Sequence, residues 1–276
     1  MIDLHTHSAQ SDGSLSPAEL IRTAKERGVS ALALTDHDTL AGLPEAEEAA
    51  REAGIRFIDG IELNIFYAAG EFHMLGLGIK NWRGSALEQT LHGLQQDRTR
   101  RNHAILDAMG RDGVDAAYSE LEELAGGKII GRPHFARLLV EKKIVKSTEQ
   151  AFQHYLKRGK PWYAPRQGLS AEEAASLIHG AGGLAVIAHP MSLYIGWKAL
   201  PQRIQLYRDQ GLDGIEAWHS NSSYRECERL QEIAFSLGMI VSAGSDFHGD
   251  HIPSRQLGHT CEDARPIEDS FARPFL

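Results

Sequence analysis

Short apolar segments alternate with longer amphipathic segments along most of the chain. Segments such as IDLH, SALAL and LAVIA are continuously apolar, whereas PAELIRTAKERG has the spacing of a helix with one apolar face. Glycines end several helical segments, as at Gly28, Gly54 and Gly183, and glycine favours a helix C-terminus. Continuously apolar strands are typical of parallel strands buried on both faces. The pattern predicts an α/β fold of repeated strand and helix units.

Seven segments carry the strand pattern. They are Ile2–His5, Ala31–Thr35, Arg56–Glu62, Phe72–Leu77, Leu184–Ala188, Gly214–Ala217 and Ile240–Ser245. Their alternation with helical segments favours a barrel over an open sheet. The alternation stops between the fourth and fifth strands, where the sequence from about Ser85 to Gly168 has mostly helical periodicity. We therefore expect a barrel formed by residues 1–95 and 169–276, interrupted by a helical insertion at residues 96–168.

The net charge, the cysteine content and the apolar runs of the chain limit the kinds of protein it can be. The chain has 276 residues, with 37 acidic and 29 basic side chains and a net charge of -8, which argues against non-specific binding to duplex DNA. Two cysteines, Cys227 and Cys261, form no disulfide framework. We expect no signal segment, and no apolar run is long enough to cross a bilayer. We expect a cytoplasmic protein without a membrane partner, and the oligomeric state is left open.

Side chains able to bind metals stand at or near the strand ends. They are His5, His7, Asp12, Asp36, His37, Glu62, His73, His189, Glu216, His219, Asp246 and His248. Alternate strand residues share a face, so His5 and His7 converge on one point. In a barrel of parallel strands, the C-terminal strand ends form one mouth, where active sites are built. Because buried imidazoles and carboxylates need partners or a metal, their coincidence indicates a metal centre.

Six motifs occur in a specific order: HTHSAQSDG, LTDHD, GIE, FHMLG, AHP and GSDFHG. Together they resemble the motifs of the PHP family, named for polymerase and histidinol phosphatase groups. The resemblance implies a distorted (β/α)7 TIM-like barrel that holds two or three divalent ions. The long insertion, its GRPHFA segment and the compact length are similar to the branch of nucleoside 3′,5′-bisphosphate phosphatases and short-RNA exonucleases.

The resemblance also implies which residues bind each ion. The sets are His5, His7, Glu62 and Asp246 for the first ion; Glu62, His73 and His134 for the second; and Asp12, His37 and His248 for the third. Mixed imidazole and carboxylate ligands suit Mn²⁺, Fe²⁺ or Zn²⁺ better than Mg²⁺, and we expect Mn²⁺. Ions roughly 3.5–4 Å apart can share a hydroxide and clamp a phosphoryl group, with Glu62 as the bridging carboxylate.

Three residues of the insertion are candidate substrate contacts. Arg132 lies two residues before His134, and Arg166 lies near the return to the barrel. A guanidinium group binds phosphate through two parallel hydrogen bonds, so either arginine could hold a remote 5′-phosphate. Trp162 is expected either to stack on a nucleobase or to pack between domains. We therefore expect these residues to bind a small nucleotide or a short RNA.

Three residues are candidates for catalytic roles beside the metal ligands. His189 and His219 follow strands, and either could orient the phosphate or protonate a leaving alkoxide. Asp36 is expected to orient a neighbouring ligand. The full metal set and the two arginines favour a phosphoesterase that removes the 3′-phosphate of nucleoside 3′,5′-bisphosphates, such as adenosine 3′,5′-bisphosphate. The alternatives are a 5′-3′ exonuclease on short RNA, a histidinol-phosphate phosphatase and a non-catalytic metal-binding module.

Overall fold

The structure, a computed structural model, describes residues 1–67, 70–126, 130–165 and 168–276. The chain divides into two compact units, of which the first comprises Met1–Gln89 with Gly168–Leu276 and the second comprises Thr90–Gln167. Each unit has its own cluster of buried apolar side chains. The domain boundaries expected from the sequence, after residues 95 and 168, stay a prediction.

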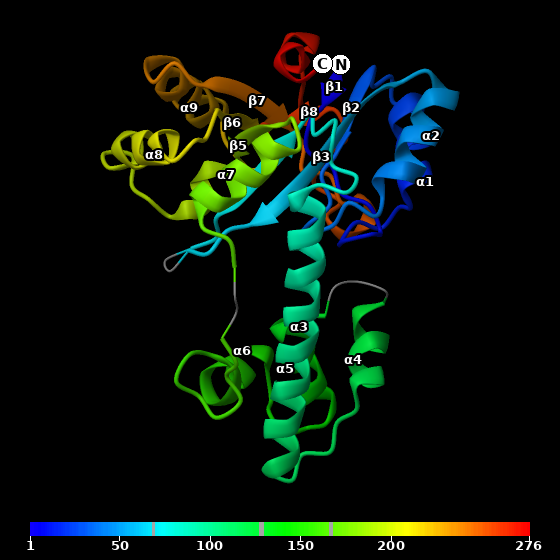
Figure 1. The fold of residues 1–276 in the computed structure, drawn as a ribbon, viewed down its shortest axis with the longest axis vertical. Helices are drawn as coiled ribbons and strands as arrows, with labels where there is room; N and C mark the ends of the chain where they lie inside the picture. The colour runs from blue at the N-terminus through cyan, green and yellow to red at the C-terminus, as the bar shows by residue number, and fades with distance from the viewer. Residues whose placement is uncertain (68–69, 127–129, 166–167) are drawn as a thin grey trace. The chain divides into compact units, whose positions relative to one another are not determined.

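The first unit is built on a sheet of seven strands that are hydrogen-bonded in chain order (Figure 1). The strands are β1 (Ile2–Asp3), β2 (Ala31–Leu34), β3 (Arg56–Asn64), β4 (His73–Leu77), β5 (Leu184–Ile187), β6 (Gly214–His219) and β7 (Ile240–Gly244). Backbone hydrogen bonds also join the two ends of the sheet, because Leu4 donates to Ala243 at 3.3 Å and Asp246 donates to His5 at 2.9 Å. The barrel expected from the sequence is therefore confirmed.

The fourth strand departs from the expected parallel arrangement. β4 runs antiparallel to both β3 and β5, whereas the other neighbouring strands are parallel. β4 is the element that follows β3 among the described residues, and His73 pairs with Asn64. The start of β4 consequently lies beside the end of β3. This reversal brings His73 to the mouth of the barrel, where a parallel fourth strand would not place it.

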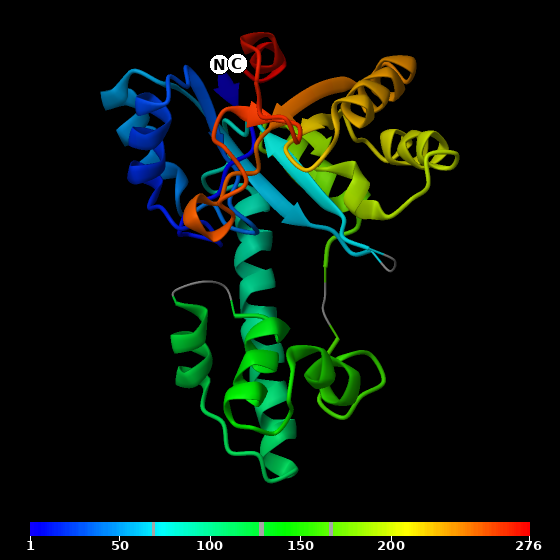
Figure 2. The same ribbon diagram turned by 180° about the vertical axis from the view of Figure 1, so that it is seen from behind.

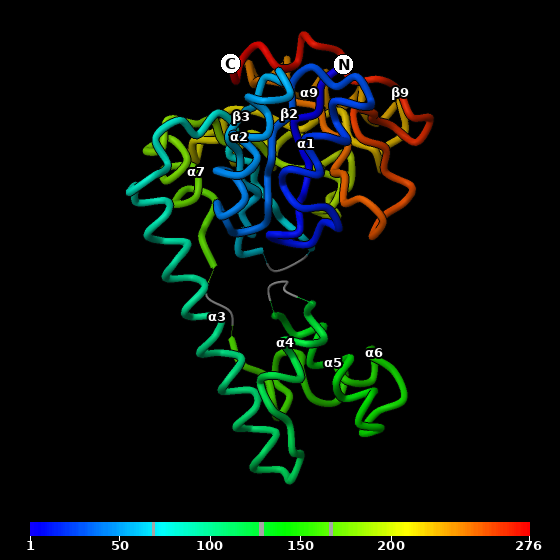
Figure 3. The backbone as a smooth tube through the Cα atoms, turned by 90° about the vertical axis from the view of Figure 1, so that its right-hand side faces the viewer, coloured from blue at the N-terminus to red at the C-terminus, as the bar shows by residue number. Residues whose placement is uncertain are grey.

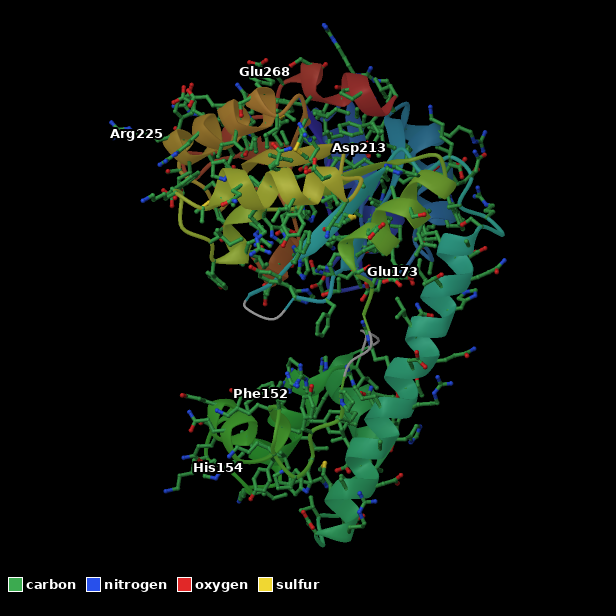
Figure 4. All side chains as sticks on the ribbon, turned by 60° about the vertical axis from the view of Figure 1, so that its left-hand side comes forward. Phe152, His154, Glu173, Asp213, Arg225 and Glu268 are labelled. Atoms are coloured by element: carbon green, nitrogen blue, oxygen red, sulfur yellow. The ribbon has the colours of Figure 1, made fainter. Side chains whose placement is uncertain are left out.

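Five helices surround this sheet (Figures 1 and 2). They are α1 (Pro17–Glu26), α2 (Leu43–Ala53), α7 (Ala171–Gly180), α8 (Leu200–Asp209) and α9 (Tyr224–Ser236). In α1, Ser16 caps the first turn by accepting a hydrogen bond from the backbone of Glu19 at 3.3 Å, and Leu20 and Ile21 are buried. Figure 3 shows α1 and α2 beside β2 and β3, and Figure 4 shows Glu173 on α7 and Arg225 on α9.

Short elements complete the first unit. They are η2 (Pro190–Leu193), η3 (Gly249–His251), β8 (His259–Thr260), β9 (Arg265–Pro266) and η4 (Asp269–Phe275). The two termini lie together (Figure 2), and the backbone of Ile2 donates to Ile267 at 3.2 Å. Phe275 of η4 belongs to the same buried cluster as Ile2 and Leu75. Apolar packing thus joins η4 to the strands of the sheet.

The second unit is helical in the part that the structure describes. Its elements are α4 (Tyr118–Ala125), α5 (Arg132–Glu141), α6 (Thr148–Ala151), the π-helical turn η1 (Phe152–Leu156) and most of α3 (Ala86–Arg111). Its core includes Ile105, Phe135 and Leu139, and Phe152 and His154 are labelled on η1 in Figure 4. None of the described helices of either unit is long and apolar enough to cross a bilayer.

Candidate metal centre

The barrel side chains expected to bind metals come together at the ends of the strands. The described residues form four groups of side chains, and within each group the potential ligand atoms all lie within 4.8 Å of one another. The groups are His5, His7, Glu62 and Asp246; His37, Glu62 and His73; His7, Asp12, His37 and His248; and His5, Glu216 and His219. The first group has the same four members as the set expected for the first ion.

Glu62 is the shared carboxylate of this centre. Its side chain is 1% exposed, and both of its oxygens face imidazoles. The Oε1 atom lies 3.0 Å from Nδ1 of His73 and 2.9 Å from Nε2 of His189. The Oε2 atom lies 3.1 Å from Nδ1 of His37 and 3.2 Å from Nε2 of His7. Glu62 is therefore placed to contribute one oxygen to each of two adjacent metal positions.

The chemistry of these donors fits divalent metal ions. Nδ1 of His37, Nδ1 of His73 and Oε2 of Glu62 are buried, and although each lies within ion-pair distance of a neighbour, none forms a hydrogen bond to a described residue. Buried polar atoms are normally hydrogen-bonded, so such unpaired atoms require another partner. Imidazole nitrogens and carboxylate oxygens are the usual protein ligands of Mn²⁺, Fe²⁺ and Zn²⁺. The donor set is thus able to hold metal ions.

The carboxylate of Asp246 connects this centre to a second set of contacts. Its Oδ1 atom lies 3.2 Å from Nε2 of His7 and 3.4 Å from Nε2 of His5. Its Oδ2 atom lies 2.6 Å from Nη1 of Arg255 and 3.2 Å from Nε2 of His219. One oxygen therefore faces the metal-binding imidazoles while the other is held by the protein.

Asp12 and His248 supply the remaining donors expected for the third ion. Nε2 of His248 lies 3.2 Å from Oδ1 of Asp12, and Nε2 of His37 lies 3.7 Å from Oδ2 of Asp12. The Asp12 side chain is 43% exposed, unlike the deeply buried Glu62. The three residues assigned to the third ion therefore lie together, at a more open position.

Strained backbone conformations occur beside these ligands. Asp38, His189 and Asp246 have positive φ angles of 50°, 26° and 55°, which side-chain-bearing residues rarely adopt. Such conformations persist where the surrounding structure enforces them, and they cluster at functional sites. The strain at His189 and Asp246 thus accompanies two side chains that contact the centre.

Glu216 supports the centre from behind His5. Its Oε1 atom lies 2.9 Å from Nδ1 of His5, and its Oε2 atom accepts a hydrogen bond from the His189 backbone at 2.7 Å. A carboxylate on one imidazole nitrogen orients the other nitrogen towards a metal. The sequence marked Glu216 as a strand-end carboxylate but indicated no role for it.

Asp36 holds the segment that follows His7. Its Oδ1 atom accepts hydrogen bonds from the Ser8 backbone at 2.7 Å and from the Ser11 hydroxyl at 2.6 Å, and its Oδ2 atom accepts one from the Ser8 hydroxyl at 2.6 Å. These bonds tie the residues between His7 and Asp12. Asp36 is therefore placed to position neighbouring ligands, and these hydrogen bonds satisfy its buried carboxylate.

His189 and His219 line a cavity of about 380 Å³ together with several candidate metal ligands. Nδ1 of His189 lies 3.0 Å from the Ser192 hydroxyl, and its other nitrogen faces Glu62. Nδ1 of His219 accepts a hydrogen bond from the Asn221 backbone at 3.1 Å, which assigns the proton of a neutral ring to Nε2. The two histidines thus form part of the cavity wall.

Residues 3–161, more than half of the chain, match the PHP domain family. The chain belongs to the PHP family. The family resemblance of the six motifs is therefore confirmed.

Similar proteins agree with this membership. This PHP chain is 39% identical to a 3′,5′-nucleoside bisphosphate phosphatase of Chromobacterium violaceum over 96% of its own length and 93% of the relative. It is 37% identical to a 5′-3′ exoribonuclease of Haemophilus influenzae, with 89% of each chain covered. A solved C. violaceum amidohydrolase with bound sulfate and no metal superposes with a TM-score of 0.77 at 35% identity, covering 100% of this chain and 97% of that one.

Two residues expected to act at the PHP centre belong to the second unit. His134 lies in the first turn of α5, where its Nδ1 accepts a hydrogen bond from the Gly131 backbone at 3.0 Å. Arg132 donates to the Leu156 carbonyl at 3.5 Å. Their roles as metal ligand and phosphate contact stay predictions. Arg166 lies outside the described residues.

Trp162 is a core residue of the second unit. Its side chain belongs to the buried cluster of that unit at 3% exposure, and its ring stacks on Tyr155 with centroids 4.1 Å apart. Its indole N–H donates to Asp112 at 2.7 Å. These contacts lie within the unit and occupy the side chain. This packing within the unit differs from the packing between domains that was expected, and the nucleobase contact stays a prediction.

We expect Gly244→Ala to disturb the PHP centre. A Cβ atom at Gly244 would collide with Cβ of His5 and would lie 2.8 Å from Oε1 of Glu216. The variant should lose about 1–3 kcal/mol of unfolding free energy and bind less metal, as measured by denaturation and metal analysis. Gly180→Ala is the control, because its Cβ meets nothing within 4 Å. Normal metal content in Gly244→Ala would show that His5 tolerates displacement.

Metal binding should release protons from the PHP centre. Burial opposes protonation of His7, but hydrogen bonds to Asp246 and Glu62 outweigh it and raise the pKa of His7 to about 10. The metal-free protein therefore holds this proton at pH 7, and a metal must displace it. Calorimetry in buffers of different ionisation enthalpy should detect the release. A binding enthalpy independent of the buffer would contradict this expectation.

The same raised pKa of His7 affects the stability of the metal-free protein. The unfolded value is about 6.5, so the stabilisation is complete below that pH and declines as pH rises towards 10. The free energy of unfolding of the metal-free protein should fall between pH 7 and pH 10. The metal-loaded protein should lack this contribution, because its His7 proton has already left.

Proposed function

We propose that this PHP protein is a metal-dependent phosphoesterase that hydrolyses the 3′-phosphate of nucleoside 3′,5′-bisphosphates, leaving the 5′-monophosphate. The convergence of buried imidazoles on Glu62 and Asp246, beside a cavity of about 380 Å³, carries the proposal. Divalent ions held there would polarise a phosphoryl oxygen and lower the pKa of a water molecule that attacks phosphorus.

Different sets of barrel residues would bind the separate ions. His5, His7, Glu62 and Asp246 would hold the first ion, and Asp12, His37 and His248 would hold a third. We propose Mn²⁺, because the ligands mix imidazoles with carboxylates.

The second metal position would use Glu62 and His73. We propose His189 as their partner, since its Nε2 atom shares Oε1 of Glu62 with Nδ1 of His73. The Ser192 hydroxyl, 3.0 Å from its other nitrogen, would hold the ring in orientation. His189 would thereby do within the barrel what the sequence resemblance assigned to His134.

Two relatives support different substrates at such a site. The C. violaceum relative is a nucleoside bisphosphate phosphatase, and its likeness extends over nearly the whole chain. The H. influenzae relative is a 5′-3′ exoribonuclease of only slightly lower identity. Hydrolysis of short RNA from the 5′ end is therefore the second candidate, whereas histidinol-phosphate hydrolysis gains support from neither relative. A non-catalytic role is disfavoured because the ligand groups of the barrel are intact.

Product analysis separates the two candidates. Mn²⁺-loaded protein would be incubated with adenosine 3′,5′-bisphosphate and, separately, with a 5′-phosphorylated RNA pentamer, and the products resolved by chromatography. We expect phosphate and AMP from the bisphosphate with the higher kcat/KM. A higher kcat/KM for mononucleotide release from RNA would make the protein an exoribonuclease. Absence of hydrolysis of both substrates, with metal bound, would overturn the proposal.

A further inference from the structure

Arg255 lies in the wall of the same cavity, after η3, and its side chain is 13% exposed. Its Nη1 atom lies 2.6 Å from Oδ2 of Asp246 and donates to the Asp246 carbonyl at 2.9 Å. Nη1 also lies 3.3 Å from Nδ1 of His248. A single nitrogen of the guanidinium group therefore makes its contacts with the metal-binding segment.

The other edge of this guanidinium group has no hydrogen-bond partner among the residues that the structure describes. Nε of Arg255 is buried without a hydrogen-bond partner, and Nη2 makes no hydrogen bond to any residue that the structure describes. Leaving a buried charged donor unpaired costs free energy, so such a donor requires an acceptor. The Nε and Nη2 edge presents two parallel N–H groups, whose spacing matches two oxygens of a phosphate or carboxylate.

The surroundings select the class of that acceptor. Arg255 is the single Arg or Lys among the described residues that line the cavity. The wall also carries Glu62 and Asp246, whose oxygens face imidazoles and candidate metal positions. Because Arg255 and these carboxylates line one cavity, an anion entering it would lie near both the candidate metal positions and the guanidinium group. A tetrahedral oxyanion has oxygens enough for both.

We propose that the Nε and Nη2 edge of Arg255 binds the phosphoryl group that is hydrolysed, while Nη1 keeps Asp246 in place. The assignment deepens the proposed function and rests on it for the identity of the substrate. It differs from the roles expected of Arg132 and Arg166, which would hold a remote phosphate. Substitution of Arg255 should therefore weaken the binding of every phosphomonoester by a similar factor, whether or not the substrate carries a second phosphate.

Arg255→Lys separates phosphate binding from support of Asp246. Lysine can keep a positive charge beside Asp246, but it does not present two parallel donors. Binding of inorganic phosphate would be measured by calorimetry on Mn²⁺-loaded protein, with the metal content determined on the same samples. We expect phosphate binding to weaken about 10- to 100-fold at unchanged metal content. Arg265→Lys, at an exposed position of β9, is the matched control and should bind phosphate normally.

A second measurement identifies the phosphate that Arg255 contacts. The kcat/KM values of Arg255→Lys and Arg255→Gln would be compared on adenosine 3′,5′-bisphosphate and adenosine 3′-monophosphate. Equal proportional losses on both substrates are expected. A loss confined to the bisphosphate would place the contact at the remote phosphate and overturn the assignment.

The remaining outcomes are also distinct. Unchanged phosphate affinity in Arg255→Lys and Arg255→Gln at full metal content would show that Arg255 serves Asp246 alone. Reduced metal content with normal phosphate affinity per metal-loaded site would also show that Arg255 supports Asp246 and does not bind phosphate. Arg255-dependent phosphate binding in a wild-type protein that hydrolyses no phosphoester would refute the proposed function while leaving the oxyanion site in place.

Discussion

Glu62→Gln should lower kcat/KM at least about 1000-fold, because one carboxylate serves two adjacent metal positions. The amide keeps the shape of the side chain but removes the charge around which His7, His37, His73 and His189 are arranged. An amide oxygen is also a poorer ligand for these ions than a carboxylate. Metal analysis and steady-state rates at saturating Mn²⁺ would measure both consequences.

The matched control for this variant is Asp59→Asn on the same strand. Asp59 is a partly buried carboxyl of β3 that belongs to none of the four ligand groups. The Asp59→Asn variant should retain normal metal content and normal turnover. Near-normal rates in Glu62→Gln would remove Glu62 from the metal centre and with it the bridging role assigned here.

Asp246→Asn should lower kcat/KM about 100- to 1000-fold. The substitution weakens a metal contact through Oδ1 and an ion pair with Arg255 through Oδ2, so metal affinity and phosphate affinity should both decline. Glu62→Gln should lower phosphate affinity only through the loss of metal, because no contact joins Glu62 to Arg255 among the described residues. The measurements are metal dissociation constants and the inhibition constant of inorganic phosphate.

Asp250→Asn provides the control for this second variant. Asp250 is an exposed carboxylate of η3, close in sequence to Asp246, and its backbone N–H donates to Ser14. Its substitution should change neither constant. Unchanged phosphate inhibition in Asp246→Asn would separate Arg255 from the carboxylate that contacts it.

The sequence predicts the barrel well because strand patterns are local. Each of the seven strands lies within two residues of its expected bounds, since continuous apolar segments must be buried on both faces. The direction of β4 is different, because it depends on how the chain turns after β3 and not on the pattern of apolar residues. The antiparallel direction was therefore missed, although His73 was correctly expected near the metal ligands.

The metal centre was predictable for residues with a distinctive position or motif. His5, His7, Glu62 and Asp246 follow or end apolar strands, where a buried charge needs a partner. Arg255 has no such signal, because an arginine in a polar segment is usually at the surface. Its role emerges only when the contact with Asp246 and the unpaired Nε atom are seen together.

The insertion was harder to interpret from sequence. Aromatic and basic residues in a helical segment have the same pattern whether they face a ligand or a core. Trp162 illustrates this, since its burial against Tyr155 depends on tertiary packing that no local pattern encodes. His134 is assigned by resemblance and Arg132 by the chemistry of its guanidinium group, and single substitutions at each would test them.

Titration of metal-free protein with Mn²⁺ tests the central claim most directly. Bound metal and phosphate release from adenosine 3′,5′-bisphosphate would be measured on the same samples. We predict that the rate is negligible without metal, rises as the centre fills, and stays negligible in Glu62→Gln over the same Mn²⁺ concentrations. Phosphate release at the full rate from metal-free protein, or a filled centre that releases none, would contradict the account.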